Sequence, residues 1–393
     1  MKILMVSPYP PQPDGIGVHA KNLVRALGGR VAVAVLTRRG HPESDDAEEH
    51  VCRVLSTSPL SLPRTIRAVH IASPDIIHYQ FNIPALGISW IWAILAGVIT
   101  RRERGAKLLF TLHEVRRDTT LLGPVGRLLY RLIAHVADAL IVYTAEARGL
   151  LVERCGIPAA MITLMPHGAP DTFPRPTDDE HAELLARYGL SKDPVLYFGY
   201  IHPDKGIEHL IDAVAELEQR SPGALDGVAV LIAGQVRTRQ GVFRYFERKD
   251  RAYEQDLHAA VERLGLQLTV RFIGYVDQRD TNVLLQSARC AVLPYMDATQ
   301  SGVLNLFIAA RTPIIANNLP GLQETLGDAG LLVEPGSAAD LALALSRLLD
   351  DKELCDTLVE RMATLHDAIT FTRVGEMLVA TYRQLLQHPH AST

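Results

Sequence analysis

The sequence is poor in cysteine and tryptophan. Its 393 residues include four cysteines and two tryptophans, and aromatic residues make up 6% of the chain. The cysteines are scattered, and none stands in C-x-x-C spacing; they are Cys52, Cys155, Cys290 and Cys355. This usage argues against a disulfide framework and against a zinc site, and it predicts reduced, buried thiols in a cytoplasmic protein.

Several catalytic signatures are also missing. The chain holds no G-x-x-x-x-G-K-(S/T), no G-x-S-x-G and no D-x-D. His113-Glu114 does not open a zinc-peptidase motif, because Arg117 stands where the second histidine would be. Lys2 is followed by only a few residues before a run of prolines, which is too short for a signal peptide.

The net charge of −4 gives no reason to expect nucleic-acid binding. The charge is unevenly spread: residues 1–168 hold 19 Lys/Arg and 13 Asp/Glu, a net +6, which leaves −10 for the rest. The basic residues of this half include Arg116, Arg117, Arg127 and Arg131. They suit an anionic substrate or peripheral contact with the inner face of a membrane, and an asymmetry without function fits equally well.

Residues 81–100 form the one long uncharged stretch, and Arg101 and Arg102 follow it. Its length is sufficient to span a bilayer. Pro84, Gly87 and Gly97 interrupt it, and it lies between two segments that look like strands. We therefore expect a helix buried against a sheet, with membrane contact as the alternative.

Short apolar runs alternate with amphipathic stretches along the whole chain. The strand candidates of the first half are 2–7, 31–37, 75–80, 108–113 and 139–144. Those of the second half are 194–200, 228–234, 268–276, 290–295, 312–317 and 330–334. Helical patterns lie between them, for example at 17–28, 122–136 and 337–350.

This alternation predicts an α/β protein with two doubly wound parallel sheets. We place the N-terminal domain at 1–168, a linker at 169–193 and the C-terminal domain at 194–369. Ligands of such sheets bind beyond the carboxyl ends of the strands, so we expect the site in a cleft where the two domains face each other.

The segment Gly15-Ile16-Gly17-Val18-His19-Ala20 fits the G-x-G-x-x-(G/A) pattern of dinucleotide-binding loops. Seven residues separate Ser7 from Gly15, whereas a dinucleotide fold takes its glycines directly from the strand. The second strand ends in Thr37-Arg38-Arg39, without the usual acidic residue. An NAD(P) site is therefore disfavoured, but free N–H groups at a helix N-terminus still suit a phosphate.

Two strand-to-helix junctions of the second half also suit an anion. Lys205-Gly206 places a cation beside a helix N-terminus. Thr299-Gln300-Ser301-Gly302 offers hydroxyls and backbone N–H groups before the next helix. A solvated turn lysine and a plain helix cap are the structural alternatives.

The order of the motifs resembles the retaining glycosyltransferases of family 4, which have the two-Rossmann GT-B architecture. The resemblance runs through the glycine loop, T-L-H-E, M-P-H-G, F-G-Y-I-H-P-D-K-G, R-F-I-G-Y-V and R-T-P-I-I-A. It extends to residues 370–386, which resemble the family's terminal helix returning to the first domain. It implies a nucleotide-sugar donor, UDP- or GDP-linked, bound mainly by the second domain, and an acceptor on the first.

The resemblance also implies roles for individual residues. The donor-phosphate residues would be Gly15, Gly17, Lys205, Ser301 and Gly302. The nucleoside residues would be Gly274, Tyr275, Val276 and Asn305. His113 would lie at the reacting sugar and act with Lys205 in catalysis, and Glu114 and Gln300 would contact acceptor or sugar. His78 is a weaker candidate that also fits a packed core histidine.

This sequence departs from the family at three positions. Tyr200 stands where the family usually has an arginine, and a phenol cannot neutralise a phosphate as a guanidinium does. Ala298 and Leu306 stand where the family usually has two glutamates, the second of which binds ribose. Thr299, Gln300 or Asn305 are the candidates to substitute, and T-Q-S-G at this place is typical of a subset of the family.

The implied reaction is a sugar transfer with retention that needs neither a metal nor a cofactor. Lys205 would stabilise the charge that grows on the departing diphosphate. Two alternatives remain open at this stage. One is a nucleotide-sugar 2-epimerase of the same fold, and the other is a non-catalytic sugar-binding subunit that has lost its glutamates.

Overall fold

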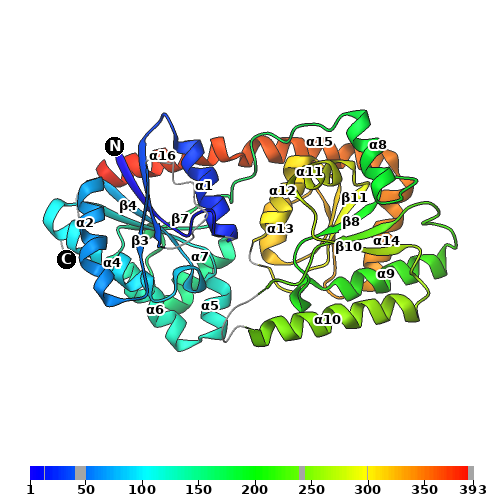
Figure 1. Cartoon of the computed structure of the whole chain (residues 1–393), viewed down its shortest axis with the longest axis horizontal. Helices are drawn as coiled ribbons and strands as arrows, with labels where there is room; N and C mark the ends of the chain where they lie inside the picture. The colour runs from blue at the N-terminus through cyan, green and yellow to red at the C-terminus, as the bar shows by residue number, and fades with distance from the viewer. Residues whose placement is uncertain (13, 40–49, 239–243, 299, 388–393) are drawn as a thin grey trace. The chain divides into compact units, whose positions relative to one another are not determined.

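A computed structural model describes residues 1–12, 14–39, 50–238, 244–298 and 300–387. The chain divides into two compact units, which are described separately (Figure 1). The N-terminal unit comprises residues 1–168 together with 369–393, and the C-terminal unit comprises residues 169–368. The segment 169–193, expected as a linker, therefore belongs to the C-terminal unit, and it contains helix α8 (Asp178–Arg187).

The N-terminal unit is built on a seven-stranded sheet of order β3-β2-β1-β4-β5-β6-β7, in which every pair is parallel. The strands are β1 Lys2–Val6, β2 Ala32–Arg38, β3 Val51–Leu55, β4 Ile76–Phe81, β5 Lys107–Leu112, β6 Ala139–Val142 and β7 Ile162–Leu164. The helices are α1 Gly15–Leu27, α2 Leu62–Ala72, α3 Ile83–Leu86, α4 Ser89–Arg104, α5 Val115–Leu121, α6 Pro124–Val136, α7 Ala145–Cys155 and α16 Phe371–Gln387.

Helices cover both faces of this sheet, which is why its inner strands β4 and β5 are buried along their whole length and mostly apolar. Alternate residues of β1 enter different cores: Leu4 and Val6 pack with residues of α4 and α6, and Ile3 and Met5 pack with residues of α1 and α16. The terminal helix α16 thus completes the N-terminal unit. Its Gly375 lies so close to α1 that a Cβ there would be 3.1 Å from Ala26 Cβ.

The C-terminal unit is built on a six-stranded parallel sheet of order β10-β9-β8-β11-β12-β13. Its strands are β8 Val195–Phe198, β9 Val230–Ala233, β10 Val270–Gly274, β11 Cys290–Leu293, β12 Ile314–Asn317 and β13 Leu331–Val333. Its helices, besides α8, are α9 Ile207–Arg220, α10 Arg244–Arg263, α11 Gln278–Ser287, α12 Gly302–Ala310, α13 Pro320–Leu326, α14 Ala338–Asp350 and α15 Lys352–Ile369.

The expected fold class of two doubly wound parallel sheets is confirmed, and each of the eleven strand candidates corresponds to a strand. Two strands were not expected, β3 and β7 at the edges of the first sheet. Ser337 caps α14 as its pattern indicated, since its hydroxyl accepts from the N–H of Asp340 at 3.2 Å. The four cysteines are free, but Cys52 and Cys355 are only partly buried.

The uncharged stretch 81–100 forms the end of β4, the short α3 and most of α4. One face of α4 is buried in the core through Trp90, Ala93 and Ala96, whereas Ile88 and Ile91 flank it in solvent. Gly97 fits against the Tyr79 hydroxyl, which donates to Ala93 O at 3.1 Å. Within the described residues, no helix combines the length and the hydrophobicity that a membrane crossing requires.

Substitution of Gly97 tests the packing of α4. A Cβ at this position would lie 1.9 Å from Tyr79 Oη, so Gly97→Ala should lower the free energy of unfolding by about 1–3 kcal/mol. The control is Gly149→Ala in α7, where the new Cβ would lie 3.9 Å from Glu153 Oε1, an ordinary contact, and helix propensity should raise stability by up to about 1 kcal/mol. Thermal unfolding measures both, and equal shifts for the two variants would contradict this packing.

Candidate active site

The strand order of each sheet reverses at one place, between β1 and β4 in the N-terminal unit and between β8 and β11 in the C-terminal unit. Loops that leave the carboxyl ends of strands at such a switch point diverge and leave room for a ligand. The residues expected at the site follow these strands and their neighbours.

In the N-terminal unit, the glycine loop after β1 leads into α1. The Asp14 carboxylate caps this helix: Oδ1 accepts from the N–H groups of Ile16 and Gly17 at 2.8 and 3.2 Å. A Cβ on Gly17 would lie 3.3 Å from Pro8, whereas one on Gly15 would meet open space. The expectation of free N–H groups here is thus wrong for Ile16 and Gly17, because a carboxylate already occupies them.

The imidazole of His113, directly after β5, is 3% exposed and lies in a buried cluster of rings. Its Nε2 is 2.9 Å from Gln80 Oε1. The His19 ring on α1 lies 5.7 Å from the His113 ring and 4.2 Å from the His167 ring. The Tyr143 hydroxyl completes the group at 2.9 Å from His19 Nε2. Sequence reasoning singled out only His113 here, although His19 and His167 stand within the quoted glycine-loop and M-P-H-G motifs.

These histidines are held neutral. Burial, followed by repulsion from His167, lowers the pKa of His19 and of His113 well below the ordinary value. Burial also lowers the pKa of His167 to about 4, against which a hydrogen bond to Gly168 O acts weakly. At neutral pH the imidazole of His113 is therefore unsuited to donate a proton, and it can orient a hydroxyl.

His78 on β4 is a packed core histidine. It is 1% exposed, and its two ring nitrogens lie 2.7 Å from Tyr382 Oη and 2.7 Å from Thr111 Oγ1. Tyr382 belongs to α16, so this histidine ties the terminal helix to the sheet. The structure therefore supports the reading of His78 as a packed core histidine, which the sequence left open.

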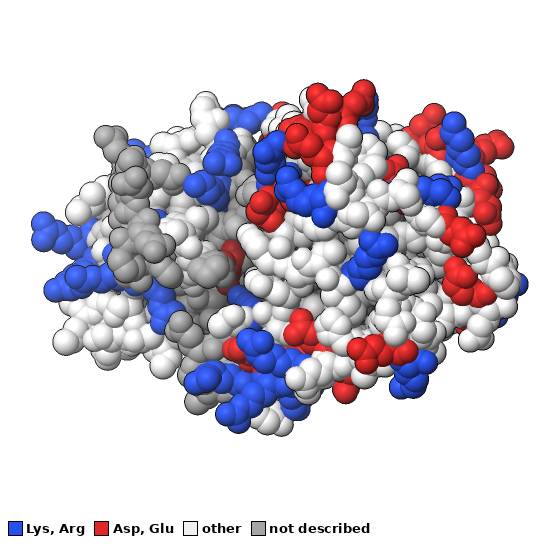
Figure 2. Space-filling model, turned by 45° about the vertical axis from the view of Figure 1, so that its right-hand side comes forward, with Lys and Arg blue, Asp and Glu red and all other residues white. Residues whose placement is uncertain are grey.

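The arginines of the N-terminal unit that suggested an anionic partner are largely engaged within the protein. Arg116 Nε lies 3.5 Å from Glu146, and Arg117 lies 3.9 Å from the expected acceptor residue Glu114. Arg131 Nε donates to Cys155 O at 2.8 Å. Figure 2 shows Lys and Arg side chains in blue and Asp and Glu side chains in red, each gathered in groups on this face of the molecule.

In the C-terminal unit, Lys205 ends a short turn after β8, the 3-10 helix η3 (Pro203–Lys205). The turn contacts the loop after β11: the N–H of Met296 donates to Asp204 O at 2.9 Å. Gly206 adopts φ +59°, and a Cβ on it would lie 2.1 Å from Pro294 O. Only glycine permits this approach. The first N–H of α9, that of Ile207, donates to the Tyr253 hydroxyl at 2.9 Å and is therefore not free for an anion.

A second close approach joins the loops after β8 and β9. A Cβ on Gly234 would lie 1.7 Å from Gly199 O, and Gly199 itself has φ +141°. Next to it, the exposed Tyr200 ring lies 5.7 Å from the guanidinium carbon of Arg237. Sequence reasoning missed Arg237, which brings a guanidinium beside the tyrosine that replaces the family's arginine.

Ser301 caps α12, the helix that follows β11: its hydroxyl accepts from the N–H of Leu304 at 3.1 Å. A Cβ on Gly302 would meet open space, so the first turn of this helix is accessible. Val303 lies within 3.8 Å of the Cβ position of Gly199, which brings α12 to the β8 loop. Lys205, Ser301 and Gly302 thus belong to loops and a helix that meet at one switch point.

The residues proposed for ribose and base are buried or half-buried, or they lie away from the β8/β11 switch point. Asn305 is 3% exposed within α12, and Gln300 is half-buried. Thr299 lies outside the described residues. Gly274 (φ +68°) ends the edge strand β10, and the exposed Tyr275 and the buried Val276 follow it. Strand β9 separates β10 from β8, the strand that leads to Lys205.

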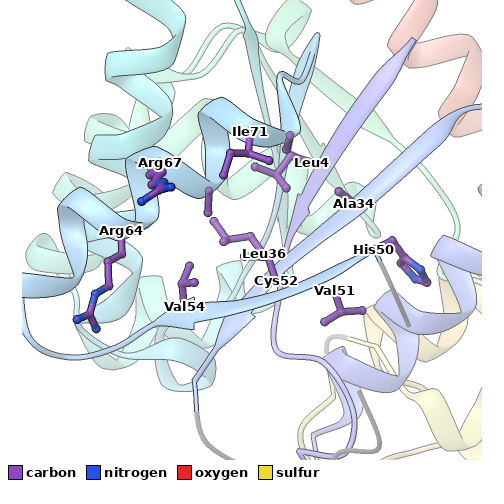
Figure 3. A pocket seen from close by; sticks show the side chains of 12 residues that line it. Leu4, Ala34, Leu36, His50, Val51, Cys52, Val54, Arg64, Arg67 and Ile71 are labelled. Carbon is purple, nitrogen blue, oxygen red and sulfur yellow. The ribbon is translucent and has the colours of Figure 1, made fainter. Parts of the chain in front are cut away.

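A cavity of about 500 Å³ lies elsewhere, on the face of the first sheet that α2 covers (Figure 3). Its lining is mainly apolar and comes from within β1, β2 and β3 and from α2, with Arg64 and Arg67 among the lining residues. None of the expected site residues lines it. In the described part of the chain, no group of three or more His, Cys, Asp or Glu side chains is arranged to hold a metal ion.

Two doubly wound units, each with a switch point in its strand order, fit the two-Rossmann GT-B fold. Residues 14–168 match the family described as "Glycosyl transferase 4-like domain", and residues 192–351 match "Glycosyl transferases group 1". Together these matches span most of the chain, which therefore belongs to this family of glycosyltransferases.

Relatives of known activity agree. The chain is 28% identical to an α-D-kanosaminyltransferase of Streptomyces kanamyceticus over 72% of each chain. It is 27% identical to a glycogen synthase of Mycobacterium tuberculosis over 89% of this chain and 86% of the relative. The protein is thus an enzyme of the hexosyltransferase type.

Solved structures share the fold. Anabaena HepE in complex with UDP aligns with a TM-score of 0.79 at 18% identity, covering 98% of this chain and 100% of HepE. The HepE complex with UDP-glucose aligns with a TM-score of 0.76 at 17% identity and the same coverage. At these identities the likeness establishes the two-domain fold.

The neutral histidines predict a stability that depends on pH. The pKa of His78 is about 3 in the folded protein against an ordinary value of 6.5, so the unfolded chain binds more protons between these values. Stability should be full above pH 6.5 and fall as the pH drops toward 3. Between pH 7.5 and 5, His78 should account for about 2 kcal/mol of the loss.

Thermal unfolding at several pH values measures this effect. His78→Asn should be less stable than wild type at pH 7.5, because it loses contacts to Tyr382 and Thr111, but it should lose less stability on acidification. A variant with the same pH dependence as wild type would show that His78 is not held neutral.

Proposed function

We propose that this glycosyltransferase transfers a sugar from a UDP- or GDP-linked donor to an acceptor hydroxyl, with retention of configuration and without a metal requirement. The observation that carries the proposal is that Lys205 and the accessible N-terminus of α12 follow β8 and β11, the two strands that flank the switch point. An ammonium and a helix N-terminus are complementary to a diphosphate. The HepE complexes with UDP and UDP-glucose make uridine donors the first to test.

The chemistry explains why positive charge is needed at this place. Cleavage of the bond between the sugar C1 and the diphosphate oxygen leaves the electron pair on that oxygen. Groups that already point at the growing charge lower the barrier without reorganising during the reaction. Lys205 supplies a full charge, the amides of Gly302 and Val303 supply partial charges, and Arg237 beside Tyr200 is a candidate for a second full charge.

We propose that retention arises from attack by the acceptor on the face that the diphosphate leaves. The acceptor oxygen forms the new bond to C1, and its proton passes to the departing phosphate oxygen, so no nucleophile of the enzyme is required. The neutral imidazole of His113 fits an orienting role, because its depressed pKa leaves the ring unprotonated at neutral pH. Glu114 and Gln300 remain candidates for contacts to acceptor or sugar hydroxyls.

The N-terminal unit would present the acceptor. Its two glycines contribute less to phosphate binding than their pattern indicates, since Asp14 occupies two of the N–H groups. We therefore assign the diphosphate mainly to the C-terminal unit. Asn305 and residues 274–276 remain proposals for the nucleoside.

A panel of UDP- and GDP-sugars tests the reaction class. The enzyme should release a nucleoside diphosphate from one donor, faster with a suitable acceptor hydroxyl, and equally well with EDTA present. Coupled detection of the diphosphate measures the release, and NMR of the product should show the anomeric configuration of the donor.

Other outcomes would contradict transfer. Reversible conversion of the sugar with no acceptor would indicate an epimerase, and binding without turnover would indicate a non-catalytic subunit. An activity abolished by EDTA and restored by a divalent cation would contradict metal independence alone.

Lys205→Ala tests the phosphate assignment. Loss of the ammonium should lower kcat about 10²- to 10³-fold while leaving the thermal midpoint near that of wild type. Lys192→Ala is the matched control, because the Lys192 ammonium donates to Asp226 O at 2.7 Å on the surface of the same unit. Near-normal turnover of the Lys205 variant would mean that the diphosphate lies elsewhere.

A further inference from the structure

The ammonium of Lys205 lies over an aromatic ring. Its Nζ is 3.6 Å from the centroid of the Tyr295 ring, well within the range of a cation–π contact. Tyr295 follows β11 and is fully buried. The lysine and the ring therefore come from the two strands that flank the switch point of the C-terminal unit.

Separate contacts fix the two partners. Asn317 Nδ2 at the end of β12 donates to Tyr295 O at 2.9 Å, which anchors the backbone that carries the ring. The lysine turn is held by the hydrogen bond from Met296 to Asp204 and by the approach of Gly206 to Pro294 O. Both backbones are therefore anchored, and the contact between ammonium and ring joins them through their side chains.

The hydroxyl of Tyr295 gives no reason for a tyrosine at this position. Tyr295 Oη is buried and has no hydrogen-bond partner among the described residues, which is unfavourable for a polar atom. The contact that this side chain does make with a charged group is through its ring face. A lysine has four flexible carbons, so an otherwise solvated ammonium would sample many positions.

We propose that Tyr295 is a positioning residue, which holds the Lys205 ammonium at the switch point before the donor arrives. The inference rests on the proposed function of Lys205 in binding the diphosphate. An ammonium held in place loses less freedom when the phosphate binds and stays aligned as charge grows on the leaving oxygen. The effect of the ring should therefore appear in kcat at saturating donor more than in KM.

Substitutions at position 295 separate the ring from the hydroxyl. Tyr295→Leu removes the ring face and should lower kcat about 10-fold. Tyr295→Phe restores the ring without the hydroxyl and should recover most of that loss. Thermal midpoints of both variants report on folding. If the Tyr295→Leu variant does not fold, phenylalanines with increasing numbers of ring fluorines can be placed at position 295. They keep the shape of the ring and weaken its attraction for a cation, so they should lower kcat in steps.

A double-mutant cycle decides whether Tyr295 acts through Lys205. In a Lys205→Met background, Leu and Phe at position 295 should give kcat values within twofold of each other, because no ammonium remains to be held. A 10-fold deficit of Leu that persists in this background would show a purely structural role and overturn the proposal. Equal kcat for Leu and Phe with Lys205 present would overturn it as well.

The same measurements separate this inference from the proposed function. A wild-type enzyme that binds neither UDP nor GDP in calorimetry, and cleaves no donor, would overturn both. Wild-type activity that depends on Lys205, with no difference between Leu and Phe at position 295, would overturn the role of the ring alone.

Discussion

The C-terminal unit depends on how closely the loops after its central strands approach each other. Gly206 rests against Pro294 O, and Gly234 rests against Gly199 O, at distances that leave no room for a Cβ. These contacts between backbones bring a lysine, a tyrosine ring and the start of α12 to one point of the sheet. Any side chain at either glycine would push the loops apart and separate the charge from the helix that complements it.

The N-terminal unit places uncharged histidines at its candidate site. It gathers His19, His113 and His167 in a buried group and keeps their imidazoles neutral by excluding water. Neutral rings can accept or donate hydrogen bonds without adding charge. A site of this kind is suited to orienting hydroxyl groups, whereas the C-terminal unit is suited to binding anions.

The sequence predicted the architecture well, since buried parallel strands are apolar runs that stand out from amphipathic helices. It missed β3, which carries Arg53 and lies at the sheet edge, and β7, which has three residues. Edge strands are buried on fewer sides, so their composition is less distinctive.

The residues proposed for the site stay predictions. Motifs led to Lys205, His113 and Ser301, which the structure places after strands or at the cap of a helix. Tyr295, His19 and Arg237 were missed because their roles come from contacts across the fold, which spacing along the chain does not encode. The capping of α1 by Asp14 was also missed. The G-x-G pattern drew attention to Gly15 and Gly17, whereas the side chain of Asp14, directly before them, determines which N–H groups are free.

That aspartate has a consequence for the departure of the product. Because the Asp14 carboxylate already caps α1, the proposed hold on a cleaved nucleotide would come mainly from the C-terminal unit. On that assignment, a departing diphosphate would leave the loops after β8 and β11, and the capped end of α1 would stay as it is.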